Sequence, residues 1–123
     1  MLYQYIDDRV LVGTGIDPNK YQYEFHPKRG TSSCFAYVGR PSDFDVTFVV
    51  IEKERPASGR KLFYFGVVEG ELPKTKNNAI DTLRDLICDD NQVFVRADLS
   101  HPKNINTRIR TALRELRSGA AVR

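Results

Sequence analysis

The sequence has no tryptophan, one methionine, two cysteines and no long hydrophobic run. Its longest purely apolar stretch, residues 48–51, is far shorter than the ~20 residues that a membrane-spanning helix needs. Near the N-terminus, Asp7 and Asp8 stand where a secretory signal would need a basic start and an apolar run. We therefore expect no membrane partner and a cytoplasmic location.

Metal ligands and groups for covalent catalysis are also scarce. Cys34 and Cys88 lie far apart and allow at most one disulfide, which the cytoplasm would normally keep reduced. A structural zinc site needs four ligands in close pairs, whereas the two cysteines, His26 and His101 are scattered. Each histidine precedes a proline, which favours a structural role in extended backbone over a Cys/His hydrolase assembled through space. No nucleotide-binding loop or catalytic signature is present, so we expect no catalytic residue, no metal and no cofactor.

The chain does contain enough apolar surface for one folded unit. Its 123 residues include seven phenylalanines and six tyrosines, and 41% of the residues are hydrophobic. This apolar content is ample to offset the chain entropy of a domain of about 100–150 residues. No linker or repeat divides the sequence, so we expect a single domain over residues 1–123.

The pattern of apolar residues predicts mainly strands first and helices late in the chain. Residues 21–26 alternate between aromatic and polar side chains, and two runs dense in β-branched and aromatic residues flank a turn at 55–59. We expect an α+β fold, with a mainly antiparallel sheet of about five strands and helices packed mostly on one face. The expected strands are residues 21–26, 34–38, 44–54, 61–70 and 93–97, and the expected helices fall within residues 2–12, 78–88 and 100–119.

Charge is distributed unevenly along the chain. Residues 100–123 carry six basic side chains and one acidic side chain, whereas the remainder carries 13 basic and 15 acidic ones. The net charge of +3 therefore reflects a mildly acidic body with a basic end. Such an asymmetry indicates which surface attracts an anionic partner, although it says nothing about the fold.

The last expected helix separates its apolar residues from its basic residues. At about 100° per residue, one stripe is apolar, and a second stripe well away from it is basic. Arginine dominates the basic stripe, and its planar fork suits phosphate and carboxylate groups. The same cations would also complement the helix dipole as a solvated face that has no partner. The apolar stripe consists of Ile105, Ile109, Ala112, Leu113 and Leu116, and the basic stripe of Lys103, Arg110, Arg114 and Arg117.

These observations predict a small non-catalytic binding module. Four cations about one turn apart can follow a phosphate backbone, so the expected partner is nucleic acid or an acidic protein surface. The expected anion-binding residues are the four of the basic stripe. An alternative is a subunit or inhibitor within a protein complex, where an edge strand such as Tyr21–His26 pairs with another chain, a second copy of this one included.

Four acidic residues flank the two central strands. If these strands pair about a turn at Ala57, Asp45 lies opposite Glu69 and Asp43 lies opposite Glu71, with all four carboxylates on one face. Like charges so close together repel unless a cation joins them, and Mg²⁺ prefers such oxygen ligands. A slip of one residue would send half of them to the other face.

This acidic arrangement is similar to that of the PD-(D/E)xK nucleases, in which an acid near one strand is followed by Glu-x-Lys on the next. The resemblance implies a metal-dependent nuclease as a second alternative. The sequence departs from that motif, because Glu69-Gly70-Glu71 and Glu52-Lys53-Glu54 have no lysine in the third place. The other interpretation is a pair of solvated strand ends close to Arg40 or Lys74.

An aromatic stripe at Tyr21, Tyr23 and Phe25 also has two interpretations. Aromatic side chains on an open sheet stack single-stranded bases in RNA-binding sheets. The RNP signature of those sheets, a basic residue followed by Gly-aromatic-Gly-aromatic, is absent. We therefore expect the stripe to be the core side of its strand, packed under a helix.

Overall fold

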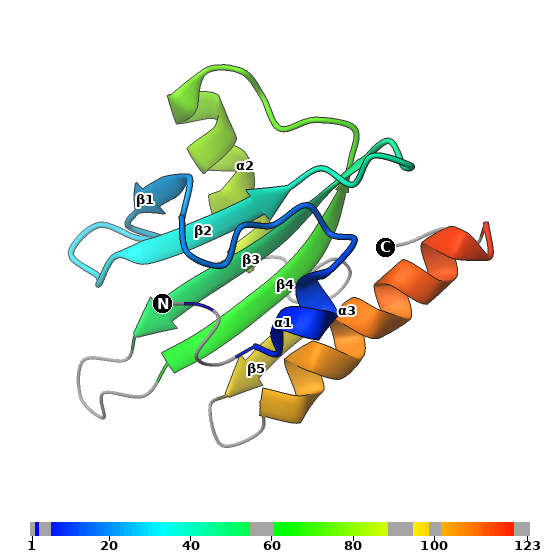
Figure 1. Cartoon of the computed structure of the whole chain (residues 1–123). Coiled ribbons are helices and arrows are strands. Elements are labelled where there is room, and N and C mark those ends of the chain that lie inside the picture. The colour runs from blue at the N-terminus through cyan, green and yellow to red at the C-terminus, as the bar shows by residue number, and fades with distance from the viewer. Residues whose placement is uncertain (1, 3–5, 55–60, 89–94, 99–101, 120–123) are drawn as a thin grey trace.

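The computed structural model describes residues 2, 6–54, 61–88, 95–98 and 102–119. These residues form an α+β architecture around an antiparallel sheet, as the sequence predicts (Figure 1). In chain order, the elements are α1 (Asp8–Leu11), β1 (Tyr23–Phe25), β2 (Cys34–Gly39), β3 (Val46–Glu54), β4 (Lys61–Glu69), α2 (Lys76–Cys88), β5 (Val95–Asp98) and α3 (Pro102–Arg117).

The strands lie side by side in the order β1-β2-β3-β4-β5, and each pairs antiparallel with its neighbour. Short connections join β1 to β2, β2 to β3 and β3 to β4, which is the geometry that antiparallel hairpins allow. The β3–β4 ladder runs from Val46 opposite Glu69 to Glu54 opposite Lys61. β1 forms one edge of the sheet and pairs with β2.

β3 and β4 are central because their residues are apolar on both faces of the sheet. Phe48 and Val50 of β3 belong to one hydrophobic cluster, whereas Val49 and Ile51 belong to another, and all four are fully buried. Phe48 stacks on Phe65 of β4 with 5.7 Å between the ring centroids. Alternate residues of these strands therefore build two separate cores.

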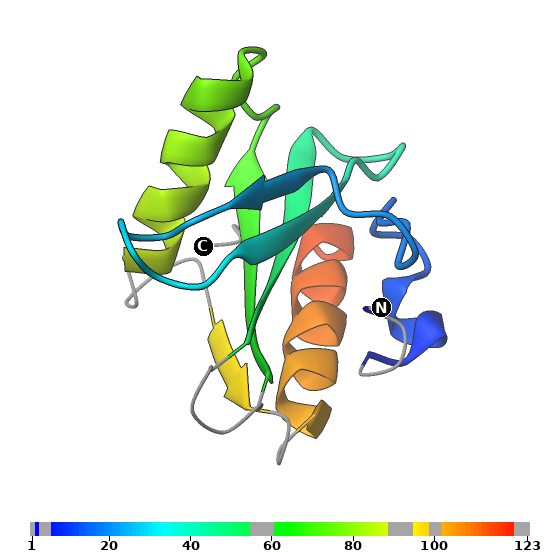
Figure 2. The same cartoon turned by 90° about the vertical axis from the view of Figure 1, so that its left-hand side faces the viewer.

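Helices cover both faces of the sheet. Ile105 and Ile109 of α3 pack in the cluster that contains Phe48, together with residues of α1. Ile80 and Leu83 of α2 pack in the cluster on the opposite face (Figure 2). The expectation that helices pack mostly on one face is not confirmed, because a sheet whose central strands are apolar on both sides needs a covering layer on each.

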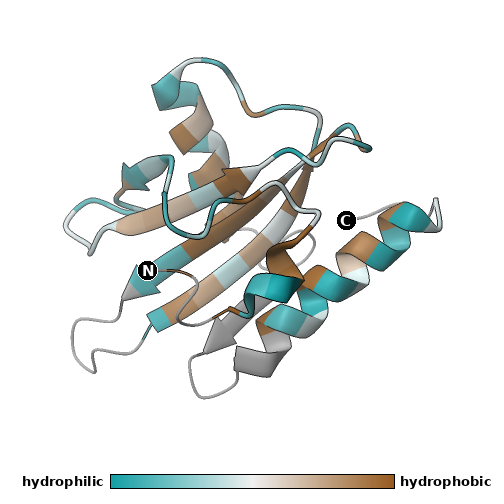
Figure 3. Ribbon diagram, viewed as in Figure 1, coloured by the Kyte–Doolittle hydropathy of each residue, from teal (hydrophilic) through white to brown (hydrophobic). Residues whose placement is uncertain are grey.

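α3 buries one side and exposes the other, as its periodicity predicts. Apolar and polar residues alternate along its ribbon (Figure 3). Each buried isoleucine or leucine contributes about 1.5–3 kcal/mol relative to an exposed position, so the apolar side sets how the helix is oriented. The buried residues are Ile105, Ile109, Ala112 and Leu113, and Leu116 packs partly buried against the same cluster.

A tight turn after α1 leads the chain toward the end of β2. Val12 has φ −59° and ψ 127°, Gly13 has φ +89°, and the N–H of Thr14 donates to the carbonyl oxygen of Leu11 at 3.0 Å. These are the angles and the hydrogen bond of a type II turn, which needs glycine at its third position. Thr14 is fully buried, and its hydroxyl donates to the same carbonyl at 2.6 Å.

The loop that follows this turn touches the sheet backbone to backbone. A Cβ built at Gly39 would lie 2.3 Å from both the carbonyl carbon of Gly15 and the nitrogen of Ile16. A Cβ built at Gly15 would lie 2.7 Å from the carbonyl oxygen of Arg40. The approach is therefore possible only with glycine on both sides. This contact fixes the loop against the end of β2.

Cys34 of β2 is fully buried, and burial raises the pKa of its thiol from 9.0 to about 11. Because the thiolate is the reactive form, we expect iodoacetamide near pH 8 to alkylate Cys34 roughly a hundredfold more slowly in the folded protein than in urea. Mass spectrometry of a Cys88→Ser variant measures the two rates, and equal rates would contradict the prediction.

The upward shift in the pKa of Cys34 also means that folding favours the protonated thiol. The contribution of the protonated Cys34 thiol to the stability of the fold is complete below about pH 9, and it is lost as the pH rises through about 11.

Candidate functional site: a groove between α1 and α3

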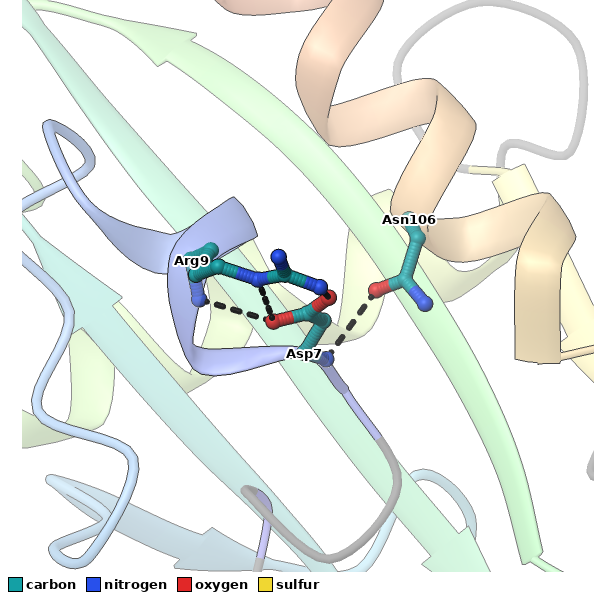
Figure 4. A network of polar contacts seen from close by, with 3 residues as sticks. All are labelled: Asp7, Arg9 and Asn106. Atoms are coloured by element: carbon teal, nitrogen blue, oxygen red, sulfur yellow. Dashed lines mark hydrogen bonds and ion pairs between the residues drawn. The ribbon is translucent and has the colours of Figure 1, made fainter.

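Asp7 holds the N-terminal segment beside α3. Its backbone N–H donates to Oδ1 of Asn106, on α3, at 3.3 Å (Figure 4). Its carboxylate caps α1, because Oδ1 accepts the backbone N–H of Arg9 at 3.0 Å. One residue therefore both starts α1 and ties it to α3.

The same carboxylate also binds the side chain of Arg9. Nη2 of Arg9 lies 3.0 Å from Oδ2 of Asp7, and Nε lies 3.3 Å from Oδ1. The side-chain hydrogen bond from Arg9 holds the pKa of Asp7 below its ordinary value, and the charge of Arg110 adds to this effect. Asp7 thus offsets much of the charge of Arg9, while the field of Arg110 reaches across from α3.

A hollow of about 390 Å³, here called the α1–α3 groove, lies between the two helices. Its lining combines guanidinium groups with apolar side chains, of which Val12 is 72% exposed. Such a lining can bind a negative charge and an apolar or flat surface at once. The groove is lined by Arg9, Val10, Val12, Arg110, Leu113, Arg114 and Arg117.

The structure brings together three of the four predicted basic residues. Arg110, Arg114 and Arg117 are all exposed and all line the α1–α3 groove. Nη2 of Arg114 donates to Oγ1 of Thr111 at 3.4 Å, and none of the three arginines forms an ion pair with another described residue. The backbone of Lys103 lies in the first turn of α3, but its side chain falls outside the described part of the chain.

Sequence reasoning missed the opposite wall of the groove. Arg9, Val10 and Val12 come from α1, which has only four residues, and from the turn after it. Two acids precede Arg9 in the sequence, so no excess of positive charge marks this segment. The only signal was the apolar spacing that predicted a short helix within residues 2–12, and it did not show which helix would lie alongside.

The predicted pairing of the acidic residues is wrong by one position. Glu69 lies opposite Val46 rather than Asp45, and the carbonyl oxygen of Asp45 accepts the N–H of Gly70 at 3.0 Å. The prediction placed the centre of the hairpin on a single residue, Ala57. A hairpin centred on one residue has an odd number of residues between the last two residues that pair. Glu54 instead pairs with Lys61, so the connection contains an even number of residues, 55–60.

A cation of the chain itself binds two of these carboxylates. Nη2 of Arg40 lies 3.2 Å from Oδ1 of Asp45 and 3.9 Å from Oε1 of Glu71. Among the described residues, no three His, Cys, Asp or Glu side chains gather where they could hold a metal ion. The arrangement therefore gives the nuclease alternative no geometric support.

Within the described ranges of the chain, no hydrogen bond joins a histidine to a cysteine. Nδ1 of the exposed His26 lies 2.7 Å from the carbonyl oxygen of Thr31, so this nitrogen carries the proton. Cys34 is buried between the sheet and α2, and His101 lies outside the described residues. The two groups that the structure does describe, His26 and Cys34, therefore give the Cys/His hydrolase no support.

The aromatic stripe divides between the two faces of the sheet. Phe25 is buried in the cluster under α2, with Tyr23 packed against it, as expected for a core side. Tyr21 precedes β1 and lies against the other face, edge-on to Phe35 with 4.9 Å between ring centroids. Tyr21 therefore does not share the face of the other two. The sheet offers no open aromatic platform at its described centre, because α2 and α3 cover it.

Within the described residues, no helix has both the length and the apolar character that crossing a lipid bilayer requires. In the α1–α3 groove, exposed guanidinium groups lie in the same lining as apolar side chains. Comparisons with protein-family models, with curated proteins and with solved structures find no match to this chain.

Proposed function

We propose that the protein is a non-catalytic module that binds a single strand of nucleic acid in the α1–α3 groove. One observation carries the proposal: Arg110, Arg114 and Arg117 are exposed in one hollow and form no ion pair with a described residue. Guanidinium groups without an ion-pair partner attract phosphates, and binding releases the counterions of the phosphates. Arg9 adds a fourth guanidinium to the lining, with much of its charge offset by Asp7.

The spacing of the three arginines suits a strand that runs along α3. Arg110 and Arg114 are four residues apart and Arg114 and Arg117 three, so each step along the helix axis is roughly 4.5–6 Å. Successive phosphates of an extended strand can therefore meet successive guanidinium groups. Because the arginines line a hollow flanked by α1, a flexible strand fits better than a duplex, whose major groove accepts a protruding helix.

The apolar residues of the groove favour nucleic acid over an acidic protein surface. Val12 and Leu113 lie among the arginines, and they give the flat faces of bases an apolar surface to contact. Arginine also stacks on bases through its planar group, which lysine cannot do. An acidic polypeptide remains the second kind of partner, and competition with poly-glutamate distinguishes it.

The double variant Arg110→Ala/Arg114→Ala tests the proposal. We expect its affinity for a labelled single-stranded oligonucleotide to fall by about tenfold or more in fluorescence anisotropy. The slope of log K against log salt should become shallower by roughly 1.4, about 0.7 for each phosphate that the variant no longer neutralises. Folding should be unchanged, because both side chains are exposed and off the apolar side of α3.

The matched control is Lys74→Ala/Lys76→Ala, which removes the same charge from two exposed positions, one just before α2 and one at its first residue. This control should bind nearly as well as the wild type. An affinity that does not change between about 50 and 200 mM salt, or an equal loss in both double variants, would reject the groove as the binding surface. Binding of labelled poly-glutamate without any binding of the oligonucleotide would assign the groove to an acidic protein.

A further inference from the structure

A second hollow adjoins the α1–α3 groove at Arg117. This pocket has a volume of about 410 Å³, within the range of sites that hold small molecules. Arg117 lines both hollows, so a ligand that follows α3 toward its C-terminal end reaches the pocket next. The lining of the pocket includes Gly13, Gly15, Arg40, Asp43, Phe44 and Arg117.

The walls of the pocket are held in place by the fold. The backbone contact of Gly15 with Arg40 joins the turn after α1 to the segment after β2. The guanidinium of Arg40 is fixed by Oδ1 of Asp45 at 3.2 Å and by Oγ1 of Thr47 at 3.4 Å. The pocket is thus formed before any ligand binds, which lowers the entropic cost of binding.

Three kinds of group remain available to a ligand in this pocket. Arg117 is an exposed cation, and its Nη2 would lie 3.6 Å from a Cβ built at Gly13, so it rests against the backbone of the turn. Asp43 is an exposed carboxylate that accepts a long hydrogen bond, 3.5 Å, from the Ser42 hydroxyl. Phe44 is half-buried and contributes an aromatic ring to the lining.

This set of groups matches one ribonucleotide. A guanidinium binds its phosphate, a carboxylate accepts hydrogen bonds from ribose hydroxyls, and an aromatic ring stacks on a base. An acidic peptide fits less well, because its carboxylates have no hydroxyl that could donate a hydrogen bond to Asp43. From this juxtaposition of Arg117, Asp43 and Phe44 beside the groove, we infer that the pocket binds a ribonucleotide of an RNA strand that continues along α3. The inference rests on the proposed function and adds the class of nucleic acid.

The test compares RNA and DNA oligonucleotides of the same sequence, with uracil in place of thymine in the RNA. The 2′-hydroxyl is the group that separates them, and a hydrogen bond to a charged partner corresponds to about tenfold or more in affinity. We expect the wild type to prefer RNA by at least about this factor. Asp43→Ala should remove the preference by weakening RNA binding while DNA binding stays the same.

The control is Asp85→Ala, which removes the same charge from an exposed position on α2, on the opposite side of the sheet. It should keep the RNA preference, and thermal melting should show all variants folded. Equal affinities for RNA and DNA, or an Asp43→Ala variant that gains affinity for both, would overturn the inference that the pocket binds a ribonucleotide. If Arg110→Ala/Arg114→Ala still weakens binding in that case, the proposed function stands without it. Binding of adenosine 5′-monophosphate but of neither oligonucleotide would overturn both the proposed function and the inference that the pocket holds part of an RNA strand.

Discussion

Gly39→Ala should lower the free energy of unfolding by about 3 kcal/mol or more, the upper end of what overpacking costs. The added Cβ would lie 2.3 Å from two backbone atoms of the loop after α1 and 2.6 Å from the carbonyl oxygen of Thr14. Backbone atoms cannot rotate away as the end of a flexible side chain can, so either the loop or β2 has to move. Urea unfolding followed by circular dichroism measures the loss.

Gly30→Ala provides the comparison for this variant. Gly30 has φ +79°, and a Cβ built there meets no atom within 4 Å, so the change costs only the backbone strain of about 1–2 kcal/mol. Gly39→Ala should also weaken oligonucleotide binding, because the displaced loop carries Val12 and Gly13. A Gly39→Ala protein that is as stable as the Gly30→Ala protein would show that the loop does not lie against β2 as described.

Phe48→Ala should lower the free energy of unfolding by about 3–5 kcal/mol. Phe48 is fully buried beneath α1 and α3, and its ring stacks on Phe65. Removing the ring leaves a cavity at the middle of the sheet, where paired strands on either side cannot close in. The change also removes apolar surface on which α3 packs, so the midpoint of thermal unfolding should fall with it.

Val12→Ala is the matched control, since it also shortens an apolar side chain. Val12 is 72% exposed, so its truncation should change the free energy of unfolding by less than about 0.5 kcal/mol. Similar losses for the two variants would place Phe48 outside the core. Because Val12 lines the α1–α3 groove, we expect Val12→Ala to change the affinity for the oligonucleotide without changing the stability.

The order of strands and helices was predictable because each depends on a local pattern. Apolar spacing located α3 and its buried side, and the dense β-branched runs located β3 and β4. Both central strands are apolar on both faces, which already required cover on both sides of the sheet. The prediction of helices mostly on one face overlooked the need to cover both faces.

The candidate site was only half predictable because half of it depends on distant contacts. Arg110, Arg114 and Arg117 share a side of one helix, so helical periodicity was enough to group them. The wall that contains Arg9 meets them only through tertiary packing, which no spacing in the sequence reports. The pairing of Asp45 with Glu69 failed for another reason: a one-residue change in hairpin length moves every partner, and composition does not determine that length.

The hydrogen bond between Asp7 and Asn106 joins residues that are 99 positions apart in the chain. A ribosome makes the first of these residues long before the second, so the two sides of the groove meet only after α3 has emerged. A nascent or truncated chain that lacks α3 presents Arg9 and Val12 with nothing opposite them. The α1–α3 groove is therefore completed late in synthesis, and its presence reports that α3 has docked on the sheet.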